Sequence, residues 1–443
     1  MRIGIVGGGA AGVMAAYRLC QAGHQAVVFE AEPELGGQAG TFPVAGTRLE
    51  RFYHHFFHSD RIAFALLEEL GLSDRLLWAP DRSAYFWGNR VYPFVTPMDL
   101  LRFRPLSWPS RLIFGLQTAY LLFGANWRPL ERITARDWLL KWGTREVYDR
   151  VWGALLRSKF GGYADRVSMA WLWGKLNARR GKSLRGRKEA LAYLDGSFQI
   201  LFDALAERIL AMGGEIHTST PALQVLVKDG AAQGLRVSEG GRTVDYPFDA
   251  IILTVASPIA LRLAPDLPEE YAALLKNQPY EGTMTLVLAL DRSLLPCYWL
   301  SIPEVDIPMV VAVEHTQFVP PRAYRGRHIV YFGRYLLADS PEFSWGKDEV
   351  LAHYTPYIKR LNPYFDPGWV VESWLFKDPY GQPVIEPGYS ARIPPHQTPI
   401  ANLYLANTTQ IYPEDRGVNY SLLLGETIAK IVQGKPARAS LLW

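Results

Sequence analysis

The sequence predicts an α/β protein in which a parallel, helix-covered sheet is joined to an antiparallel sheet and a helical insertion. Three observations carry this prediction. Residues 3–30 show a strand, turn, helix and strand in succession, and residues 280–395 hold strand-like stretches separated by prolines. Between them, from Thr96 to about Arg187, the pattern is helical and dense in Trp, Leu and Arg. A chain of 443 residues is too long for one simple core, so two or three domains are expected.

The N-terminal pattern is that of a βαβ unit. Residues 3–6 (IGIV) predict a short buried strand, and residues 26–30 (AVVFE) predict a second one. The helix between them covers Ala10–Ala22, and Gly23 ends it. Because a helix that connects two such strands makes them run parallel, this unit predicts the start of a doubly wound sheet.

Further elements extend the pattern along the chain. Residues 84–94 (AYFWGNRVYPF) alternate around Gly88 and Asn89, which is a hairpin signal. Residues 248–255 (FDAIILTV) predict another buried strand, and the segment 402–434 predicts a strand, a loop and a helix. The predicted domains are 1–80, 196–265 and 396–443 for the parallel-sheet domain, 81–95 and 266–395 for the antiparallel-sheet domain, and 96–195 for the helical insertion.

Composition excludes several classes of protein. A net charge of +4 from 47 basic and 43 acidic residues is only mildly basic, so no nucleic-acid partner is expected. Two cysteines, Cys20 and Cys297, favour a reducing compartment and predict a cytoplasmic protein. The apolar N-terminal run is interrupted by glycines, unlike a signal peptide. The longest uncharged run, Leu112–Asn126, is too short to cross a bilayer.

A glycine motif lies directly between the first predicted strand and helix. Gly7, Gly9 and Gly12 match G-x-G-x-x-G, with Ala11 in the same turn, and Glu30 ends the next strand. The first glycine permits the turn, the second lets a pyrophosphate approach the helix N-terminus, and the third allows close packing. Glu30 is placed to accept hydrogen bonds from ribose hydroxyls, and it disfavours a 2′-phosphate. The motif therefore predicts a dinucleotide cofactor.

Two further segments favour FAD over NAD. The pair Gly36 and Gly37, followed by Gln38, supplies backbone amides close to the first pyrophosphate site. Near the other end of the chain, Gly417–Asn419, which includes Val418, precedes a helix whose N-terminus is suited to a flavin ring or ribityl chain. One long cofactor would then be held by both ends of the chain.

Together with "TPALQV" at 220–225, these motifs resemble the FAD-dependent amine oxidase, protoporphyrinogen oxidase and phytoene desaturase superfamily. The resemblance implies a Rossmann-type FAD-binding domain in which the backbone of Ala222 meets the adenine and Gly417–Asn419 lies under the flavin. Two positions depart from the family: Gln38 stands where it has Arg, and Asn407-Thr408 where it has Gly-Asp. Backbone amides can still carry the phosphate recognition.

The segment 49–60 (LERFYHHFFHSD) is rich in His and aromatic residues. A metal site would need further ligands that the sequence does not supply, so no metal is predicted. An aromatic core with hydrogen-bonded histidines remains an alternative. The favoured interpretation is a wall facing the flavin, with His55 and His58 as catalytic candidates. The segment is also similar to "G-A-H-I-F-H-T-N" of UDP-galactopyranose mutase, where His55 and His58 fall on the mutase histidines and Tyr53 replaces its glycine.

Two basic, aromatic segments bear on partners. Residues 100–130 mix Trp108, Tyr120 and Trp127 with four arginines, so peripheral membrane contact and a buried helical subdomain are equally open interpretations. Residues 177–189 carry six basic side chains, which is typical of a solvated loop or of a site for anionic lipid or a phosphorylated substrate. Lys159 is a further polar candidate for the pocket, although a single lysine at the end of a helix is more often a surface residue.

These features predict an enzyme, an FAD-dependent oxidoreductase that removes hydride from an apolar small molecule such as a polyene, a porphyrinogen or a lipid. It would be cytoplasmic, either free or peripheral on the membrane. One alternative is a mutase-like, redox-neutral flavoenzyme that acts on a nucleotide sugar. Another is a non-catalytic FAD-binding scaffold at a membrane surface.

Overall fold

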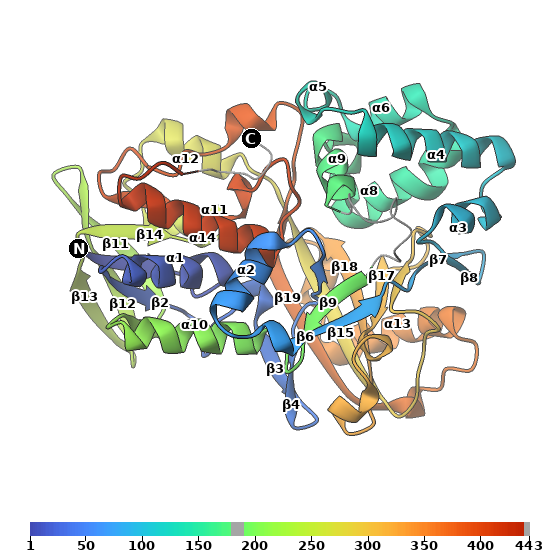
Figure 1. Cartoon of the computed structure of the whole chain (residues 1–443), viewed down its shortest axis with the longest axis horizontal. Coiled ribbons are helices and arrows are strands. Elements are labelled where there is room, and N and C mark those ends of the chain that lie inside the picture. The colour runs from blue at the N-terminus through green and yellow to red at the C-terminus, as the bar shows by residue number, and fades with distance from the viewer. Residues whose placement is uncertain (179–189, 438–443) are drawn as a thin grey trace.

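The computed structural model describes residues 1–178 and 190–437. The parallel sheet with its helices lies on the left of Figure 1, the large antiparallel sheet at lower right and the helical region at upper right. The three parts contact one another, and the chain passes between them several times. The described residues therefore form the mixed α/β architecture that the sequence predicts.

A five-stranded parallel sheet forms the centre of the first part, within the described residues. Its strands pair in register, from Ile3 with Ala250 on one side to Val6 with Phe29 on the other. They are buried on both faces because helices cover one side and a small sheet the other. In spatial order the strands are β10 (Glu215–His217), β2 (Gln25–Phe29), β1 (Arg2–Val6), β14 (Ala250–Leu253) and β20 (Leu403–Leu405).

Helices from distant parts of the chain cover one face of this sheet (Figure 1). They approach closely because glycine leaves room: a Cβ on Gly425 would lie 2.3 Å from the carbonyl oxygen of Ala11. The helices are α1 (Ala10–Gln21), α10 (Gln199–Ala211) and α14 (Val418–Val432). The small sheet on the other face consists of β11 (Ala222–Lys228), β12 (Ala231–Glu239) and β13 (Arg242–Pro247), and α11 (Ser257–Leu263) and α12 (Glu269–Lys276) follow β14 along the chain.

The second part is a seven-stranded sheet in the described chain, and neighbouring strands run antiparallel except β16 and β7, which are parallel. The predicted hairpin at 84–94 is confirmed, since Gly88 and Asn89 both have positive φ between paired strands. Helix α13 (Lys347–Leu361) packs on one face. In spatial order the strands are β19 (Val370–Pro383), β15 (Tyr280–Leu290), β18 (His328–Leu336), β17 (Val311–Glu314), β16 (Trp299–Ser301), β7 (Ser83–Trp87) and β8 (Arg90–Pro93).

The third part is helical and has its own aromatic core. Its helices are α3 (Pro97–Arg102), α4 (Trp108–Phe123), α5 (Trp127–Leu130), α6 (Ala135–Trp142), α7 (Arg145–Val147), α8 (Gly153–Phe160) and α9 (Met169–Asn177), with one π-helical turn at Tyr148–Trp152. None of the described helices is long and apolar enough to cross a membrane.

Residues 190–194 lie inside the predicted helical insertion but form a strand. This strand, β9 (Ala190–Leu194), pairs with β5 (Phe56–Phe57) and with β6 (Leu76–Pro80). The sequence does not predict it, because its pairing partners lie more than a hundred residues earlier. Near it the chain also forms β3 (Thr41–Val44), β4 (Thr47–Glu50) and α2 (Arg61–Glu69).

Candidate active site

The glycine motif forms a turn at the N-terminus of α1. Gly7 has φ +106°, a conformation that favours glycine, and Gly9 caps the helix with φ −73°. The backbone amide of Gly36 donates to the carbonyl of Gly8 at 2.9 Å, so the second glycine pair lies beside the first. A Cβ on Gly9 would meet only the Cα of Gly37, at 3.8 Å. The space in front of the helix N-terminus is therefore free of protein atoms at Gly9.

Gly12 has the opposite environment. A Cβ there would lie 1.9 Å from the carbonyl oxygen of Gly7 and 2.9 Å from Oγ1 of Thr254. Gly12 is thus required by packing, whereas Gly9 leaves room for a ligand. Ala11, the other predicted contact in this turn, is buried within α1.

Glu30 lies directly behind this turn. Its Oε2 accepts from the amide of Gly8 at 2.5 Å, and its Oε1 accepts from the amide of Glu32 at 2.9 Å. Each carboxylate oxygen can accept a second hydrogen bond, so hydroxyl donors of a ribose can still be accommodated. The amide of Thr220 donates to the carbonyl of Glu30 at 2.8 Å, which brings the start of β11, and with it Ala222, to the same region.

The other predicted contacts lie at the N-terminus of α14. Gly417 caps the helix in an extended conformation, and a Cβ there would meet nothing within 4 Å. Partly buried Val418 begins the helix. Buried Asn419 accepts at Oδ1 from the amides of Ile62 and Ala63, at 3.0 and 3.1 Å, and so joins α14 to α2.

The side chain of Asn407 links two loops of the protein. Its Nδ2 donates to the carbonyl of Val255 and to Oγ of Ser257, at 3.1 and 3.2 Å. Its Oδ1 accepts from the amide of Thr409 at 3.1 Å. The side chain therefore ties the loop after β20 to the loop after β14, and its polar atoms are committed to protein contacts.

Gln38 and Arg416 form a polar link that the sequence does not predict. Gln38 Nε2 donates to Asp378 at 2.9 Å, and Nη1 of Arg416 lies 3.5 Å from Gln38 Oε1. Nε of Arg416 donates to Gln382 at 2.9 Å. The guanidinium of Arg416 thus lies beside Gln38, the position at which the family that the sequence resembles carries Arg. Arg416 itself directly precedes Gly417. The position of Arg416 directly before the predicted flavin contact Gly417 is the sequence signal that could have identified this arginine as a site residue.

The segment 49–60 is an irregular stretch, with β5 in its middle, that leads into α2. His54 Nδ1 lies 2.6 Å from the carbonyl of Phe52, which can only accept, so Nδ1 carries the proton. Burial lowers the pKa of His54 to about 4, and the ring is neutral at neutral pH.

His55 Nδ1 lies 3.1 Å from the hydroxyl of Tyr298. His58 is exposed and stands edge-on to Trp78, so the structure gives His55 and His58 different surroundings.

Aromatic rings surround His55. Its ring is edge-on to Phe57 at 4.9 Å, to Tyr298 at 5.7 Å and to Trp299 at 5.8 Å. Tyr53 is edge-on to Trp299 at 5.1 Å and lies directly on β18, where Gly333 has no side chain to obstruct it. We call Tyr53, His55, Phe57, Tyr298 and Trp299 the aromatic wall.

A partly buried ion-pair network joins the helical region to the loop before Gly417. Asp415 lies 2.7 Å from Nζ of Lys159 and 3.2 Å from Nζ of Lys175, and it accepts from Nε1 of Trp171 at 3.1 Å. The two lysines hold the pKa of Asp415 far below its usual range although burial opposes this. Burial lowers the pKa of Lys159. Lys159 is therefore an interior residue beside the predicted flavin end.

Glu281, at the start of β15, is fully buried, and neither carboxylate oxygen finds a hydrogen-bond partner among the described residues. A Cβ on Gly161 would lie 3.2 Å from its Oε1. Burial raises the pKa of Glu281 to about 7. An unpaired buried carboxylate is costly, so this group favours the protonated form.

Replacing Glu281 by glutamine is expected to stabilise the protein above pH 7 and to change little near pH 5. The pKa of Glu281 in the folded protein exceeds the usual value of 4.5, so the folded state holds a proton that the unfolded chain releases. The contribution of Glu281 to the free energy of unfolding therefore falls by about 3 kcal/mol as pH rises from about 4.5 to about 7. Thermal midpoints of both proteins at pH 5 and pH 8 measure this, with exposed Glu372→Gln on β19 as control. A difference that is independent of pH would contradict the prediction.

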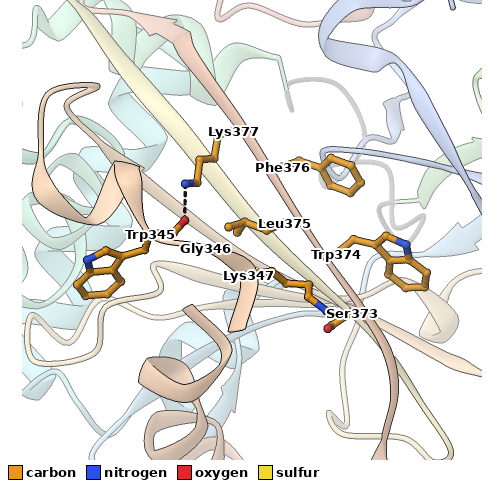
Figure 2. A pocket seen from close by; sticks show the side chains of 8 residues that line it. All are labelled: Trp345, Gly346, Lys347, Ser373, Trp374, Leu375, Phe376 and Lys377. Atoms are coloured by element: carbon orange, nitrogen blue, oxygen red, sulfur yellow. Dashed lines mark hydrogen bonds between the residues drawn. The ribbon is translucent and has the colours of Figure 1, made fainter. Parts of the chain in front are cut away.

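Two conspicuous features lie elsewhere. A surface hollow of about 590 Å³ is lined by Trp345, Gly346, Lys347 and residues 373–377 (Figure 2). Trp374 and Phe376 pack on Phe42, whereas Lys377 donates to the carbonyl of Trp345 at 2.5 Å. None of the residues of the glycine turn lines this hollow.

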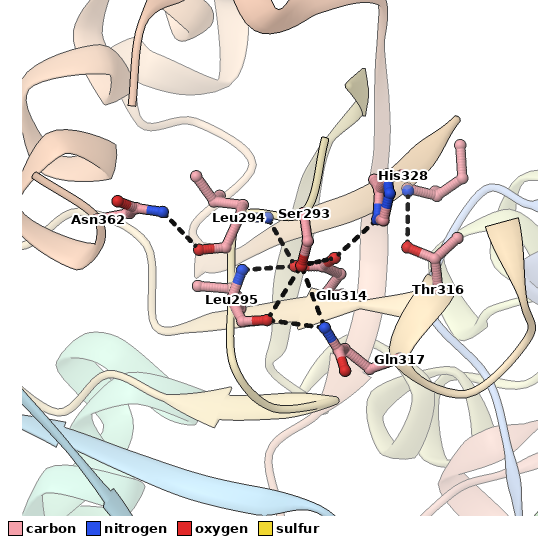
Figure 3. A network of polar contacts seen from close by, with 9 residues as sticks. Ser293, Leu294, Leu295, Glu314, Thr316, Gln317, His328 and Asn362 are labelled. Carbon is pink, nitrogen blue, oxygen red and sulfur yellow. Dashed lines mark hydrogen bonds and ion pairs between the residues drawn. The ribbon is translucent and has the colours of Figure 1, made fainter. Parts of the chain in front are cut away.

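The polar network of Figure 3 is centred on buried Glu314, which accepts from the amides of Leu294 and Leu295 at 3.0 and 2.5 Å and from Ser293 Oγ at 2.6 Å. The carboxylate fixes the loop after β15 to the sheet. We assign it a structural role. Among the described residues, no group of three or more His, Cys, Asp or Glu side chains could hold a metal ion.

Most of the basic run predicted at 177–189 falls outside the described residues, which resume at Ala190. The structure brings the glycine turn, Gly36, Gly37 and Glu30 to the carboxyl ends of β1 and β2, and it places Gly417–Asn419 at the N-terminus of α14, whereas Asn407 lies in the loop after β20. The open positions at Gly9 and Gly417 fit a bound dinucleotide, because a Cβ would meet only Gly37 Cα at 3.8 Å at the first and nothing within 4 Å at the second, and both residues cap helix N-termini.

Comparisons with known proteins agree with this geometry. A sequence model of the family described as flavin containing amine oxidoreductase matches residues 10–414. The 15-cis-phytoene desaturase of Synechococcus elongatus is 24% identical, and the match covers 98% of this chain and 96% of that protein. Matches to plant phytoene desaturases cover about half of those proteins, 49% for the one from Glycine max.

Two solved structures share the fold across nearly the whole chain. A protein named as a protoporphyrinogen oxidase, from Exiguobacterium, has a TM-score of 0.75 at 19% identity, over 98% of this chain and 99% of that chain. Reduced UDP-galactopyranose mutase has a TM-score of 0.74 at 14% identity, over 99% of this chain and 96% of that chain.

Proposed function

The chain belongs to the flavin containing amine oxidoreductase family and is an FAD-dependent oxidoreductase; on that premise we propose that it removes hydride from an apolar substrate such as a polyene, a porphyrinogen or a lipid. The observation that carries the proposal is the aromatic wall, which side chains of the 49–60 segment form together with side chains at β16 of the large sheet. The names of the curated relatives, which are desaturases, agree with it.

The residues that would hold FAD are those of the two helix N-termini. Backbone amides near Gly9 and Gly37 would bind the pyrophosphate, Glu30 the ribose, and the amides from Gly417 onward the flavin end. Bound FAD would supply the hydride acceptor, so the protein has to orient the substrate and exclude water.

The aromatic wall is suited to both tasks. Rings packed edge to face give a rigid surface of low polarity, and a neutral His54 adds no charge beside it. His55 would be a positioning residue that stays fixed through Tyr298, because its Nδ1 is engaged there at 3.1 Å. The cations nearby have protein partners, since Arg416 donates to the amide of Gln382 and Lys159 forms an ion pair with Asp415.

Anaerobic reduction of the bound flavin tests the proposal. The purified holoprotein is mixed with a detergent-solubilised polyene, a porphyrinogen, a neutral lipid or UDP-galactose, and the visible flavin absorbance is followed. We expect bleaching by one of the apolar donors, return of the absorbance when a quinone or oxygen is added, and no response to UDP-galactose.

The other outcomes separate the alternatives. A spectrum that UDP-galactose changes only after dithionite reduction would support the mutase-like reaction in place of the proposed one. Bound flavin that no donor reduces would support the scaffold interpretation. In either case the substrate class proposed here would be wrong while the cofactor assignment stands.

A further inference from the structure

Part of the helical region exposes large apolar side chains. They come from α3, α4 and the end of α6, which lie together at upper right in Figure 1. We call this surface the α4 face. Its members are between 38% and 71% exposed: Met98, Leu101, Trp108, Leu112, Leu116, Tyr120, Phe123 and Trp142.

Helix α4 is apolar on two opposite sides. One side packs inward, where Phe114 lies 4.9 Å from the ring of Trp152. On the other side Trp108, Leu112 and Leu116 recur every fourth residue and so form one outward stripe. A helix that is apolar all round is normally buried on all sides, but the outward stripe of α4 is not covered by the described chain.

The charge around the α4 face is predominantly positive, although Asp99 lies on α3 and Glu146 accepts from Ser107 at the start of α4. Residues 100–130 contain Arg102, Arg104, Arg111 and Arg128 but no Asp or Glu. None of the ion pairs within the described residues involves these four arginines. Arg111 lies 4.9 Å above the ring of Trp108 and donates to the carbonyls of Leu101 and Leu106. On α6, Lys141 lies 5.5 Å above the ring of Trp142.

An apolar stripe edged by Trp, Tyr and unpaired cations matches one kind of partner. Trp and Tyr are favoured at the headgroup level of a bilayer, and each nearby Lys or Arg adds attraction to anionic lipid. Arginine stems also extend along apolar surface while the guanidinium stays in water. An acidic protein would match the charge alone, but it would not account for so large an apolar stripe on a single helix.

We propose that the α4 face docks on the surface of an anionic phospholipid bilayer, with α4 parallel to the membrane plane and its outward stripe among the acyl chains. This goes beyond the proposed reaction and does not depend on it. The helical region that carries the face also holds Lys159, whose bond to Asp415 reaches the loop before Gly417. A docked protein would therefore present its flavin end close to the phase in which apolar molecules dissolve.

Vesicle sedimentation tests the proposal. The holoprotein is mixed with vesicles of phosphatidylcholine alone or with phosphatidylglycerol, at low and high salt, without any substrate. The test variant is the double change Leu112→Glu and Leu116→Glu. The control is Val305→Glu and Tyr364→Glu, which adds the same charge at two apolar residues that are 82% and 84% exposed elsewhere.

We expect the wild type and the control to sediment with phosphatidylglycerol vesicles, more weakly at high salt. The Leu112/Leu116 variant should bind these vesicles at least about tenfold more weakly than the wild type, because two apolar side chains no longer enter the bilayer. Both variants should keep their flavin and their thermal midpoint, because the changed side chains are exposed.

Three results would overturn the proposal. One is a wild type that remains in the supernatant with every vesicle. Another is equal binding by the two double variants. The third is a wild type that is dimeric by size-exclusion chromatography, becomes monomeric in the Leu112/Leu116 variant and never binds vesicles, which would assign the α4 face to a second copy of this chain. None of these measurements uses turnover, so they are independent of the reaction proposed above.

Discussion

Replacing Gly12 by alanine is expected to abolish the folded, flavin-containing protein. The added Cβ would lie 1.9 Å from the carbonyl oxygen of Gly7, and both atoms belong to backbone that is fixed between β1 and α1. A flexible side chain could move aside, but this backbone cannot without unwinding the helix start. We expect destabilisation of more than about 4 kcal/mol. Soluble yield, flavin content and thermal unfolding of the purified variant measure the effect.

Gly9→Ala is the matched control for this prediction. Its Cβ would meet only the Cα of Gly37, at 3.8 Å, and its φ of −73° suits any residue. The apoprotein should therefore unfold at the wild-type apoprotein temperature, while FAD binds more weakly because a methyl group enters the phosphate space. Comparing apoproteins removes the stabilisation that bound FAD itself provides. Undiminished FAD binding in Gly9→Ala would contradict the assignment of this turn to the pyrophosphate.

Replacing Asp415 by asparagine is expected to cost about 3–5 kcal/mol of stability. The carboxylate is the ion-pair partner of the Lys159 ammonium, whose side chain is only 12% exposed, and it also pairs with Lys175. Without it the ammonium of Lys159 stays buried and loses its countercharge, which is more costly than the loss of an ordinary hydrogen bond. The thermal midpoint of the variant, together with that of exposed Asp245→Asn as control, measures the effect.

A second change tests the cause. Adding Lys159→Met to Asp415→Asn removes the unpaired charge, so the double variant should be more stable than Asp415→Asn alone. If the double variant is less stable than the single one, burial of an unpaired lysine is not the source of the loss. The asparagine change should also loosen the contact between α8 and the loop before Gly417, which is measurable as weaker FAD retention.

The parts of the site that the sequence predicts are local in the chain. Gly7, Gly9 and Gly12 stand within six residues of one another, and their spacing alone fixes the strand, turn and helix. Glu30 follows at the end of the next strand of the same unit, so its place behind the turn is also predictable. The hairpin at Gly88 and Asn89 is confirmed for the same reason, because its turn requires positive φ at both residues.

The parts that the sequence does not predict join residues far apart. Lys159 meets Asp415 across more than two hundred positions, and Gln38 meets Arg416 across more than three hundred. No periodicity or motif records such pairs, because they depend on how the three parts pack. The segment 49–60 shows the same limit: its spacing allows His55 and His58 to share a helix face, but Phe56 pairs with Ala192 in a strand and directs them differently.

The order of strands in the parallel sheet has a consequence for synthesis on the ribosome. β1 and β2 are made first, but β20 and α14, which complete the same domain, come only at residues 403–405 and 418–432. The large sheet, through Pro383, has by then been translated. Because a domain generally folds as a unit, β1, α1 and β2 must remain without part of their hydrophobic core until residues 403–432 have emerged. FAD capture then requires residues 403–432 to have emerged, and a stall in translation before residue 403 leaves a polypeptide with the glycine turn but without the flavin end of the site.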